Sequence, residues 1–336
     1  MKRALAALLA GVGLSIAACG APPEPKTVPR TTEAPLHEGP LTDYVPAAGL
    51  RWMVVGSPRR LARHPSLTPA IALLLPDARL DAFAEGTGVE LRNTEHALVA
   101  GFDYAMLYLV EPPNAARAEE RFRARLVTEP AVARPHPRVA RITGLVGKTP
   151  QTLIRVEDRL LAVAVGSATP ARVVELFALE KLEKSPAALR GAALSSLPQE
   201  LGRAPLRFYA PGPFAEEWTR GARGLLAAAV AVGATLQPLP NGRLEAAIFV
   251  AGDWSTTAIE ATSGLLAAWE DLARSSTGRL LGLNEPLSAP RVDLKEDVLE
   301  LRVELDALTL ARGLRAAVEA DVWEILDLAP PKADGP

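Results

Sequence analysis

The sequence contains one cysteine, Cys19, whose thiol is among the most reactive side-chain groups in proteins. Cys19 ends an apolar run, residues 4–18, that follows Lys2 and Arg3. A cationic start, an apolar stretch and a small-residue end together make a secretory signal. The run is shorter than the roughly 20 residues that span a bilayer. We therefore expect residues 1–18 to be a signal peptide that is removed from the mature protein.

Ile16, Ala17, Ala18 and Cys19 resemble the lipobox of bacterial lipoproteins, in which a branched apolar residue and two small residues precede the cysteine. The resemblance implies that the Cys19 thiol receives a diacylglyceryl group and that the new N-terminus is acylated, for example with palmitate. One acyl chain alone holds a protein to a bilayer only marginally, whereas several hold it firmly. Gly20 follows the cysteine where an Asp would imply retention in the inner membrane. The implied location is the outer membrane, with the folded part facing the periplasm.

The mature sequence is mildly acidic. Removal of residues 1–18 takes away two of the 37 basic side chains and leaves 35 against 39 acidic ones. Because no long basic block is present, we expect no nucleic acid among the partners. The single thiol is used by the anchor, so the folded part has none for a disulfide, a zinc–thiolate site or a cysteine nucleophile. We expect stability to come from core packing.

Two other motifs that suggest chemistry have simpler structural interpretations. The stretch GLVGKT, Gly144–Thr149, is similar to the end of a phosphate-binding loop, but Ile142 stands where that pattern needs glycine. We expect a glycine hairpin turn there. Ser57 lies between an expected strand and an expected helix, and Pro58 after it favours a helix N-cap over a nucleophile.

The other titratable residues form no local site in the sequence. Four histidines are too far apart for a local metal clip: His37, His64, His96 and His136. The acidic pairs Glu119-Glu120 and Glu216-Glu217 fall in expected first helical turns, where carboxylates complement the helix dipole. We expect no catalytic residue, no metal and no cofactor, although residues distant in sequence could still converge in the folded chain.

The expected organisation has four parts after the signal. Residues 19–48 are rich in Pro, Thr, Glu and Gly, and we expect a disordered tether there, semi-extended behind the lipidated cysteine. The folded body follows as two α+β units in tandem, residues 49–200 and 201–328, each with a mainly antiparallel sheet. Residues 329–336 are expected to be a disordered tail.

The two units have a similar order of expected elements. In the first, strands over 51–56, 96–111 and 152–165 are separated by helices over 58–75, 77–85 and from residue 114, and a helix opens at Thr169. In the second, strands over 206–210, 242–252 and 291–305 accompany helices over 214–236, 258–273 and 308–326, with a capping box of Thr257 and Glu260. Acidic turns at 157–158 and 296–297 match, which favours an internal duplication.

One segment is apolar with small residues all round. We expect Gly224–Leu236 to be a buried helix packed on the sheet, too short to span a bilayer, or alternatively a helix that lines an apolar ligand cavity. Three tryptophans flank it and are expected in the core or at its edge, with a binding role as the alternative: Trp218, Trp254 and Trp269.

These features favour a membrane-anchored, extracytoplasmic lipoprotein that acts as a non-catalytic binding, scaffold or adaptor module of the cell envelope. Its expected partners are the membrane, through the N-terminal lipid, and an envelope protein or an apolar ligand. Two alternatives stay open. One is a hydrolase whose active site assembles only in three dimensions, and the other is a carrier of a lipid or similar apolar ligand.

Overall fold

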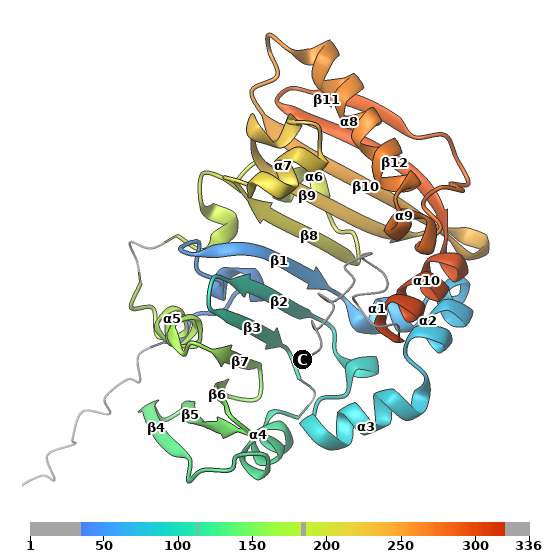
Figure 1. Ribbon diagram of the computed structural model, residues 1–336. Helices are drawn as coiled ribbons and strands as arrows, with labels where there is room; N and C mark the ends of the chain where they lie inside the picture. The colour runs from blue at the N-terminus through green and yellow to red at the C-terminus, as the bar shows by residue number, and fades with distance from the viewer. Residues whose placement is uncertain (1–34, 113, 183–185, 320–336) are drawn as a thin grey trace, which may run out of the picture. The chain divides into compact units, whose positions relative to one another are not determined.

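The computed structural model describes residues 35–112, 114–182 and 186–319, and all named strands in this part of the chain belong to a 12-stranded antiparallel sheet. Across the sheet the order is β11-β12-β10-β9-β8-β1-β2-β3-β7-β6-β5-β4 (Figure 1). The strands are β1 (Leu50–Gly56), β2 (Ala97–Phe102), β3 (Ala105–Val110), β4 (Ala131–His136), β5 (Val139–Val146), β6 (Thr149–Val156), β7 (Leu160–Gly166), β8 (Leu206–Pro211), β9 (Ala229–Pro238), β10 (Arg243–Gly252), β11 (Arg291–Lys295) and β12 (Val298–Asp306).

Helices cover parts of both faces of this sheet. They are α1 (Pro58–Ala62), α2 (Thr68–Leu74), α3 (Asp77–Thr87), α4 (Ala115–Ala124), α5 (Thr169–Ala178), α6 (Leu197–Leu201), α7 (Glu216–Gly221), α8 (Ala258–Arg274), α9 (Ser276–Leu280) and α10 (Ala307–Glu319). Among the residues described, no helix combines the length and the hydropathy that crossing a bilayer requires. The expected α+β class with a mainly antiparallel sheet is therefore confirmed.

The two expected units occupy contiguous halves of the one sheet. Residues 49–200 supply β1 to β7, and residues 201–328 supply β8 to β12. The halves meet where β1 pairs with β8, from Met53 opposite Tyr209 to Gly56 opposite Leu206. The two sheets that the sequence suggests are thus fused edge to edge instead of packed face to face.

Outward from this junction both halves have the same topology. The orders β1-β2-β3-β7-β6 and β8-β9-β10-β12-β11 correspond, and α4 follows β3 as α8 follows β10. The equivalent hairpins β6–β7 and β11–β12 turn at Glu157 and Glu296, whose φ angles are 52° and 49°. The hairpin β4–β5 is additional in the first half. A duplication would leave this pattern, but a shared topology does not by itself establish shared descent, so duplication stays a prediction.

The largest cluster of buried side chains lies on one side of the sheet, which we call the core face. Met53, Leu98, Leu107 and Tyr209 contribute to it from central strands. Helices α5 and α6 close it from outside. Strand residues alternate between the two faces of a sheet, so the neighbours of these core residues point to the opposite side.

The tether expected over residues 19–48 extends too far toward the C-terminus. Residues 36–45 belong to the core: Leu36, Leu41, Tyr44 and Val45 are all buried. The Tyr44 hydroxyl donates a hydrogen bond to the His37 carbonyl oxygen over 2.8 Å, and burial raises the pKa of this phenol. These three aliphatic side chains and one aromatic ring hold the segment on the core face. They are few among many prolines and polar residues, so the composition of residues 19–48 as a whole does not reveal them. The tether expected for 19–34 lies outside the described residues.

The helix expected over 214–236 is wrong. Helix α7 ends at Gly221, and residues 229–238 form β9, hydrogen-bonded to β8 and β10 on its two sides. Small residues in β9 allow α6 to approach the sheet closely, since a Cβ on Gly233 would lie 2.7 Å from the Leu201 Cδ1 atom. Pairing with two neighbouring strands therefore overrides the helical preference of the alanines.

Other expected helices differ at their boundaries. The helix over 58–75 is divided, because Pro65 opens a 3-10 turn and α2 begins only at Thr68. Thr257 and Ser57 stand at N-cap positions, yet neither side chain accepts a cap hydrogen bond, whereas Asn114 does so from the Arg117 N–H. The closing helix begins as expected, at Ala307, and its residues beyond 319 lie outside the described part, as does the expected tail at 329–336.

The packing of residues 36–45 gives a test. We expect Tyr44→Ala to lower the free energy of unfolding by about 3–5 kcal/mol, because the ring is 2% exposed and its removal leaves a cavity. Tyr104→Ala is the matched control, since that ring is 86% exposed and its loss should change the free energy by about 0.5 kcal/mol or less. Denaturant unfolding measures both, and equal effects would mean that residues 36–45 belong to the tether.

Candidate functional site

The face of the sheet opposite the core face carries apolar side chains at its centre. Facing pairs in the register are Phe208 with Val54, Val54 with Val99, and Val99 with Tyr108, which form one row across four strands. Trp52 and Met106 flank this row, both opposite Gly101. We call these six residues the central apolar face: Trp52, Val54, Val99, Met106, Tyr108 and Phe208.

These six side chains are only partly buried. Tyr108 is 41% exposed, and the other five are intermediate, whereas their strand neighbours on the core face, such as Met53 and Leu107, are fully buried. A sheet with one solvated face usually alternates apolar and polar residues, and a sheet apolar on both faces is usually covered on both. The central strands thus have the composition of a sheet that is covered on both faces. The described residues, however, leave the central apolar face partly exposed.

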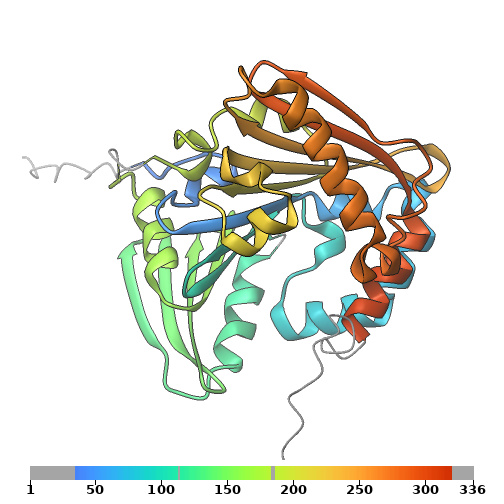
Figure 2. The same cartoon turned by 45° about the horizontal axis from the view of Figure 1, so that its top comes forward.

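Two helices cover this side of the sheet at its margins, and α7 lies at one end of the central strands, where its Trp218 lines a hollow together with Trp52. Helix α4 packs through Ala118 and Phe122 on Ile142 of β5. Helix α8 packs through Leu265 and Trp269 against the β12 side chains that include Leu301. Figures 1 and 2 both draw these two helices on either side of β3, β2, β1 and β8.

The uncovered width fits a helix. Four neighbouring strands spaced at about 4.8 Å extend over about 14 Å from the first to the last. An α-helix with its side chains has a diameter of about 10–12 Å. The layer of helices on this side therefore has a gap, among the described elements, that one additional helix would fill.

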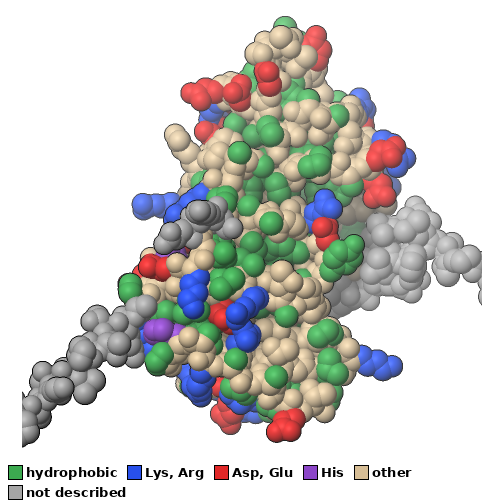
Figure 3. Space-filling view, turned by 90° about the vertical axis from the view of Figure 1, so that its left-hand side faces the viewer, with side chains coloured by type: hydrophobic (Ala, Val, Ile, Leu, Met, Phe, Trp, Pro, Cys, Tyr) green, Lys and Arg blue, Asp and Glu red, His purple; other side chains and the backbone are tan. Residues whose placement is uncertain are grey.

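An aromatic hollow lies at one end of the central apolar face and shares Trp52 with it. Its volume is about 490 Å³, and Phe214 and Trp218 line it together with Arg51, Pro211 and Pro213. The Phe214 and Trp218 rings are stacked, with centroids 6.4 Å apart and planes at 13°. Figure 3, which views the left-hand side of Figure 1, shows hydrophobic side chains gathered at mid-height on this side. The apolar surface thus continues past the edge of the central strands.

Strand β9 extends the same surface. Val230, Val232 and Leu236 alternate with the buried residues of β9, and Val230 is 53% exposed. The segment expected to be a buried helix is therefore a strand that contributes to an apolar surface. Of the three tryptophans, Trp254 and Trp269 are buried, as expected for core residues, and Trp218 is 50% exposed.

Two buried carboxylates elsewhere in the fold are each paired with basic side chains. Glu300 on β12 is buried and accepts hydrogen bonds from Lys295 and Arg302, over 2.7 and 2.6 Å. The hydrogen bond to Glu300 raises the pKa of Lys295. Glu175 on α5 is also buried and pairs with Arg141 and Arg172. We interpret both clusters as structural, because the basic partners neutralise each buried carboxylate.

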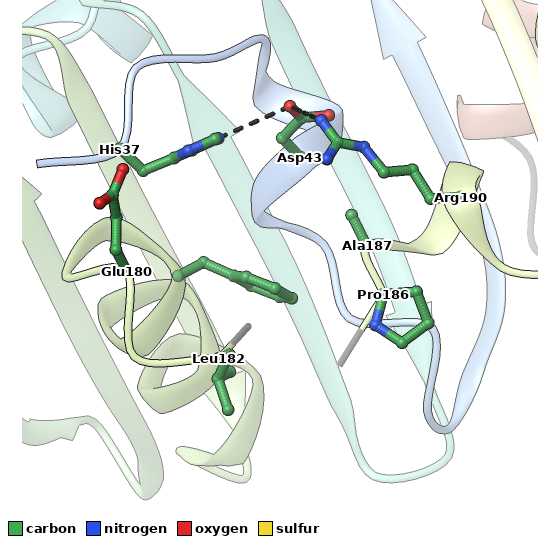
Figure 4. A pocket seen from close by; sticks show the side chains of 8 residues that line it. His37, Asp43, Glu180, Leu182, Pro186, Ala187 and Arg190 are labelled. Atoms are coloured by element: carbon green, nitrogen blue, oxygen red, sulfur yellow. Dashed lines mark hydrogen bonds and ion pairs between the residues drawn. The ribbon is translucent and has the colours of Figure 1, made fainter. Parts of the chain in front are cut away.

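A second hollow, of about 420 Å³, collects titratable groups beside α5 (Figure 4). Asp43 there lies 3.5 Å from the His37 Nε2 atom and 2.6 Å from an Arg190 guanidinium nitrogen. Glu180 lines the same hollow. None of the described residues that line this hollow is a serine, threonine, cysteine or lysine. Within this described lining, the Asp43–His37 pair therefore has no side-chain nucleophile to activate.

The histidines remain separate in the folded chain. His96 pairs with Glu111 over 2.6 Å, His64 contacts the Ser66 hydroxyl over 2.8 Å, and His136 ends β4. Within the described ranges no group of three or more His, Cys, Asp or Glu side chains could hold a metal ion. Residues 144–149 form the β5–β6 hairpin, as expected for a glycine turn. Cys19 and the residues 16–18 before it lie outside the described part.

Sequence analysis did not identify the central apolar face. The signal was present, because apolar residues stand at consecutive positions in Trp52–Val55 and again in Leu107–Val110. Consecutive apolar residues in a strand predict that both faces are covered, and nothing in the local sequence indicates that one cover is missing.

No protein-family model matches this chain, and no curated protein matches it. Among solved structures, the one titled "Structure of crystal form I of TP0453" is similar, with 10% sequence identity and a TM-score of 0.44. The similarity covers 83% of this chain and 98% of that chain. At this identity and score it carries no argument about what the chain binds.

The two faces of β1 give a matched test of exposure. Val55 is 4% exposed on the core face, so Val55→Thr should lower the free energy of unfolding by about 1–3 kcal/mol by burying a hydroxyl. Val54→Thr, on the central apolar face, should change it by about 0.5 kcal/mol or less. Denaturant unfolding compares the two, and a Val54 effect as large as that of Val55 would show that the face is fully covered.

Proposed function

We propose that this chain is a lipid-anchored, non-catalytic binding module of the cell envelope whose central apolar face receives an amphipathic helix of a partner protein. One observation carries the proposal: the layer of helices over the sheet has a gap about one helix wide, above six partly exposed apolar side chains. Contiguous exposed apolar surface is characteristic of interaction sites.

A helix suits this surface better than a carried lipid does. Pockets for small apolar ligands are concave and enclose most of the ligand surface. The central apolar face is instead a sheet surface bordered by α4 and α8, and a helix laid on it would bury only one side of itself, as recognition helices do. The aromatic hollow at Trp52 and Trp218 would accept a large side chain at one end of such a helix.

The cellular setting of the proposal comes from the sequence. The lipobox at 16–19 supports export, cleavage of the signal peptide and acylation of Cys19, with Gly20 favouring the outer membrane and a body in the periplasm. In that setting the partner is an envelope protein, and the tether between the anchor and Pro35 lets the face reach it.

Photo-crosslinking in cells tests the binding surface. With benzoylphenylalanine in place of Tyr108, we expect a crosslinked adduct of this chain with a discrete envelope protein. The same probe at Tyr104, a more exposed tyrosine in the β2–β3 turn, is the matched control and should give no such adduct. Val99→Asp should abolish the adduct, and Val132→Asp on the distant strand β4 should leave it unchanged.

The outcomes of this experiment separate the alternatives. Equal adducts at positions 104 and 108 would mean random collision and would contradict the proposal. Adducts at 108 with lipid alone, identified by mass spectrometry, would replace it by the lipid-carrier alternative.

The anchor is tested independently. We expect Cys19→Ser to move the protein from the membrane fraction to the soluble fraction, because the thiol that would carry the diacylglyceryl group is gone. Cell fractionation followed by mass spectrometry of the N-terminus measures this. A Cys19→Ser chain that stays in the membrane fraction would show that another segment holds the protein there.

A further inference from the structure

A hollow of about 550 Å³ lies where the two halves of the sheet meet, at the opposite end of β1 and β8 from the aromatic hollow. The first half lines it through Arg60 of α1 and through His64, which follows that helix. The second half lines it through Glu200 of α6, through residues 201–205 and through residues 237–238 at the end of β9. We call this space the junction hollow.

Two arginines hold the loop of residues 202–205 that forms part of the wall. The Arg60 guanidinium donates a hydrogen bond to the Arg203 carbonyl oxygen over 3.2 Å, and this bond joins the two halves. Arg207 donates to the Gly202 carbonyl oxygen over 3.2 Å from the other side of the loop. A guanidinium has five N–H donors, so Arg60 keeps further donors for a ligand. The wall is therefore positioned before any ligand binds.

The arginines at this hollow lack the carboxylate partners that the arginines beside the two buried carboxylates have. Arg60, Arg203 and Arg207 form no ion pair with any other described residue. The Arg207 Nε atom is buried and has no hydrogen-bond partner in the described part of the chain. Glu200 is the one carboxylate among the described residues that line the hollow. Three guanidinium groups against one carboxylate leave two positive charges in excess, with His64 not counted.

An excess of two positive charges complements a phosphate monoester, which carries about −1.5 to −2 charges at pH 7. The planar guanidinium group also matches phosphate in shape, because it donates two parallel hydrogen bonds to two phosphate oxygens. We propose that the junction hollow binds a ligand that carries a phosphate monoester. Arg60 and Arg203 are its hydrogen-bond donors, and Arg207 contributes positive charge from behind the loop.

Glu200 sets which phosphate compounds fit. Its carboxylate repels additional negative charge, so a second phosphate group on the ligand is disfavoured. The same carboxylate accepts a hydrogen bond from a hydroxyl or ammonium group next to the phosphate. The site therefore favours a small monophosphate that carries such a group over a polyphosphate. This is a second binding site, and it uses none of the six residues of the central apolar face.

Calorimetric titration with glycerol phosphate tests the site on the full chain that carries Cys19→Ser. We expect Arg203→Gln to weaken binding about tenfold or more, because it removes charge-assisted hydrogen bonds to the phosphate. Glu200→Gln should strengthen binding about threefold, since it removes a like charge from the wall. Arg291→Gln is the matched control and should leave the affinity unchanged, because Arg291 is an exposed arginine on the edge strand β11.

Two of the variants separate loss of the site from loss of the fold. Arg60→Gln keeps an N–H donor for the Arg203 carbonyl oxygen but removes the charge, so it should weaken binding as Arg203→Gln does. A gain of affinity in Glu200→Gln cannot arise from misfolding. Equal affinities of the unaltered chain and Arg203→Gln, or no binding at millimolar glycerol phosphate, would overturn the proposal.

Vesicles identify the source of the phosphate. Co-sedimentation with phosphatidylcholine vesicles that contain phosphatidic acid, lost in Arg203→Gln, would assign the site to a lipid headgroup. Binding of glycerol phosphate without co-sedimentation would assign it to a soluble phosphate monoester. The crosslinking expected at Tyr108 does not depend on this site, so failure of phosphate binding would leave the proposed function standing.

Discussion

The pairing of β1 with β8 is the constraint on which the rest of the structure depends. It joins two halves of equivalent topology edge to edge, so the strands that start each half become the centre of the sheet. In each half the helix that follows the third strand packs on outer strands of the face opposite the core face: α4 in the first half and α8 in the second. The centre is therefore the place that neither helix covers. The apolar surface follows directly from the way the halves are joined.

Local order was predictable where short-range signals agree. The hairpins at 157–158 and 296–297 combine an acidic turn with flanking β-branched and leucine residues, and both form as expected. Asn114 opens α4 with a side-chain cap, and Pro170 in the first turn of α5 fixes its start. In these places the residues that set an element lie within that element, so no knowledge of its neighbours was needed.

The failures arise where the deciding contacts are distant in sequence. Residues 229–238 are a strand because β8 and β10 pair with both their edges, and their alanines and valines do not specify this locally. Tyr44 is buried because α5 and residues 187–190 meet it on the core face, although its neighbours are typical of a tether. The central apolar face is a further feature that depends on contacts distant in sequence. Val54 and Val99 indicate a covered strand, and only the tertiary arrangement of α4 and α8 leaves them partly exposed.

An apolar sheet surface on a module that we propose to be lipid-anchored must bind its partner without adsorbing to the bilayer. Exposed apolar surface promotes non-specific association, and an acylated N-terminus would keep that surface near a bilayer at high local concentration. Under the proposed function, specific partners are those whose helix fills both the central strands and the aromatic hollow beside Trp52, because a bilayer surface cannot supply a side chain of that shape to the hollow.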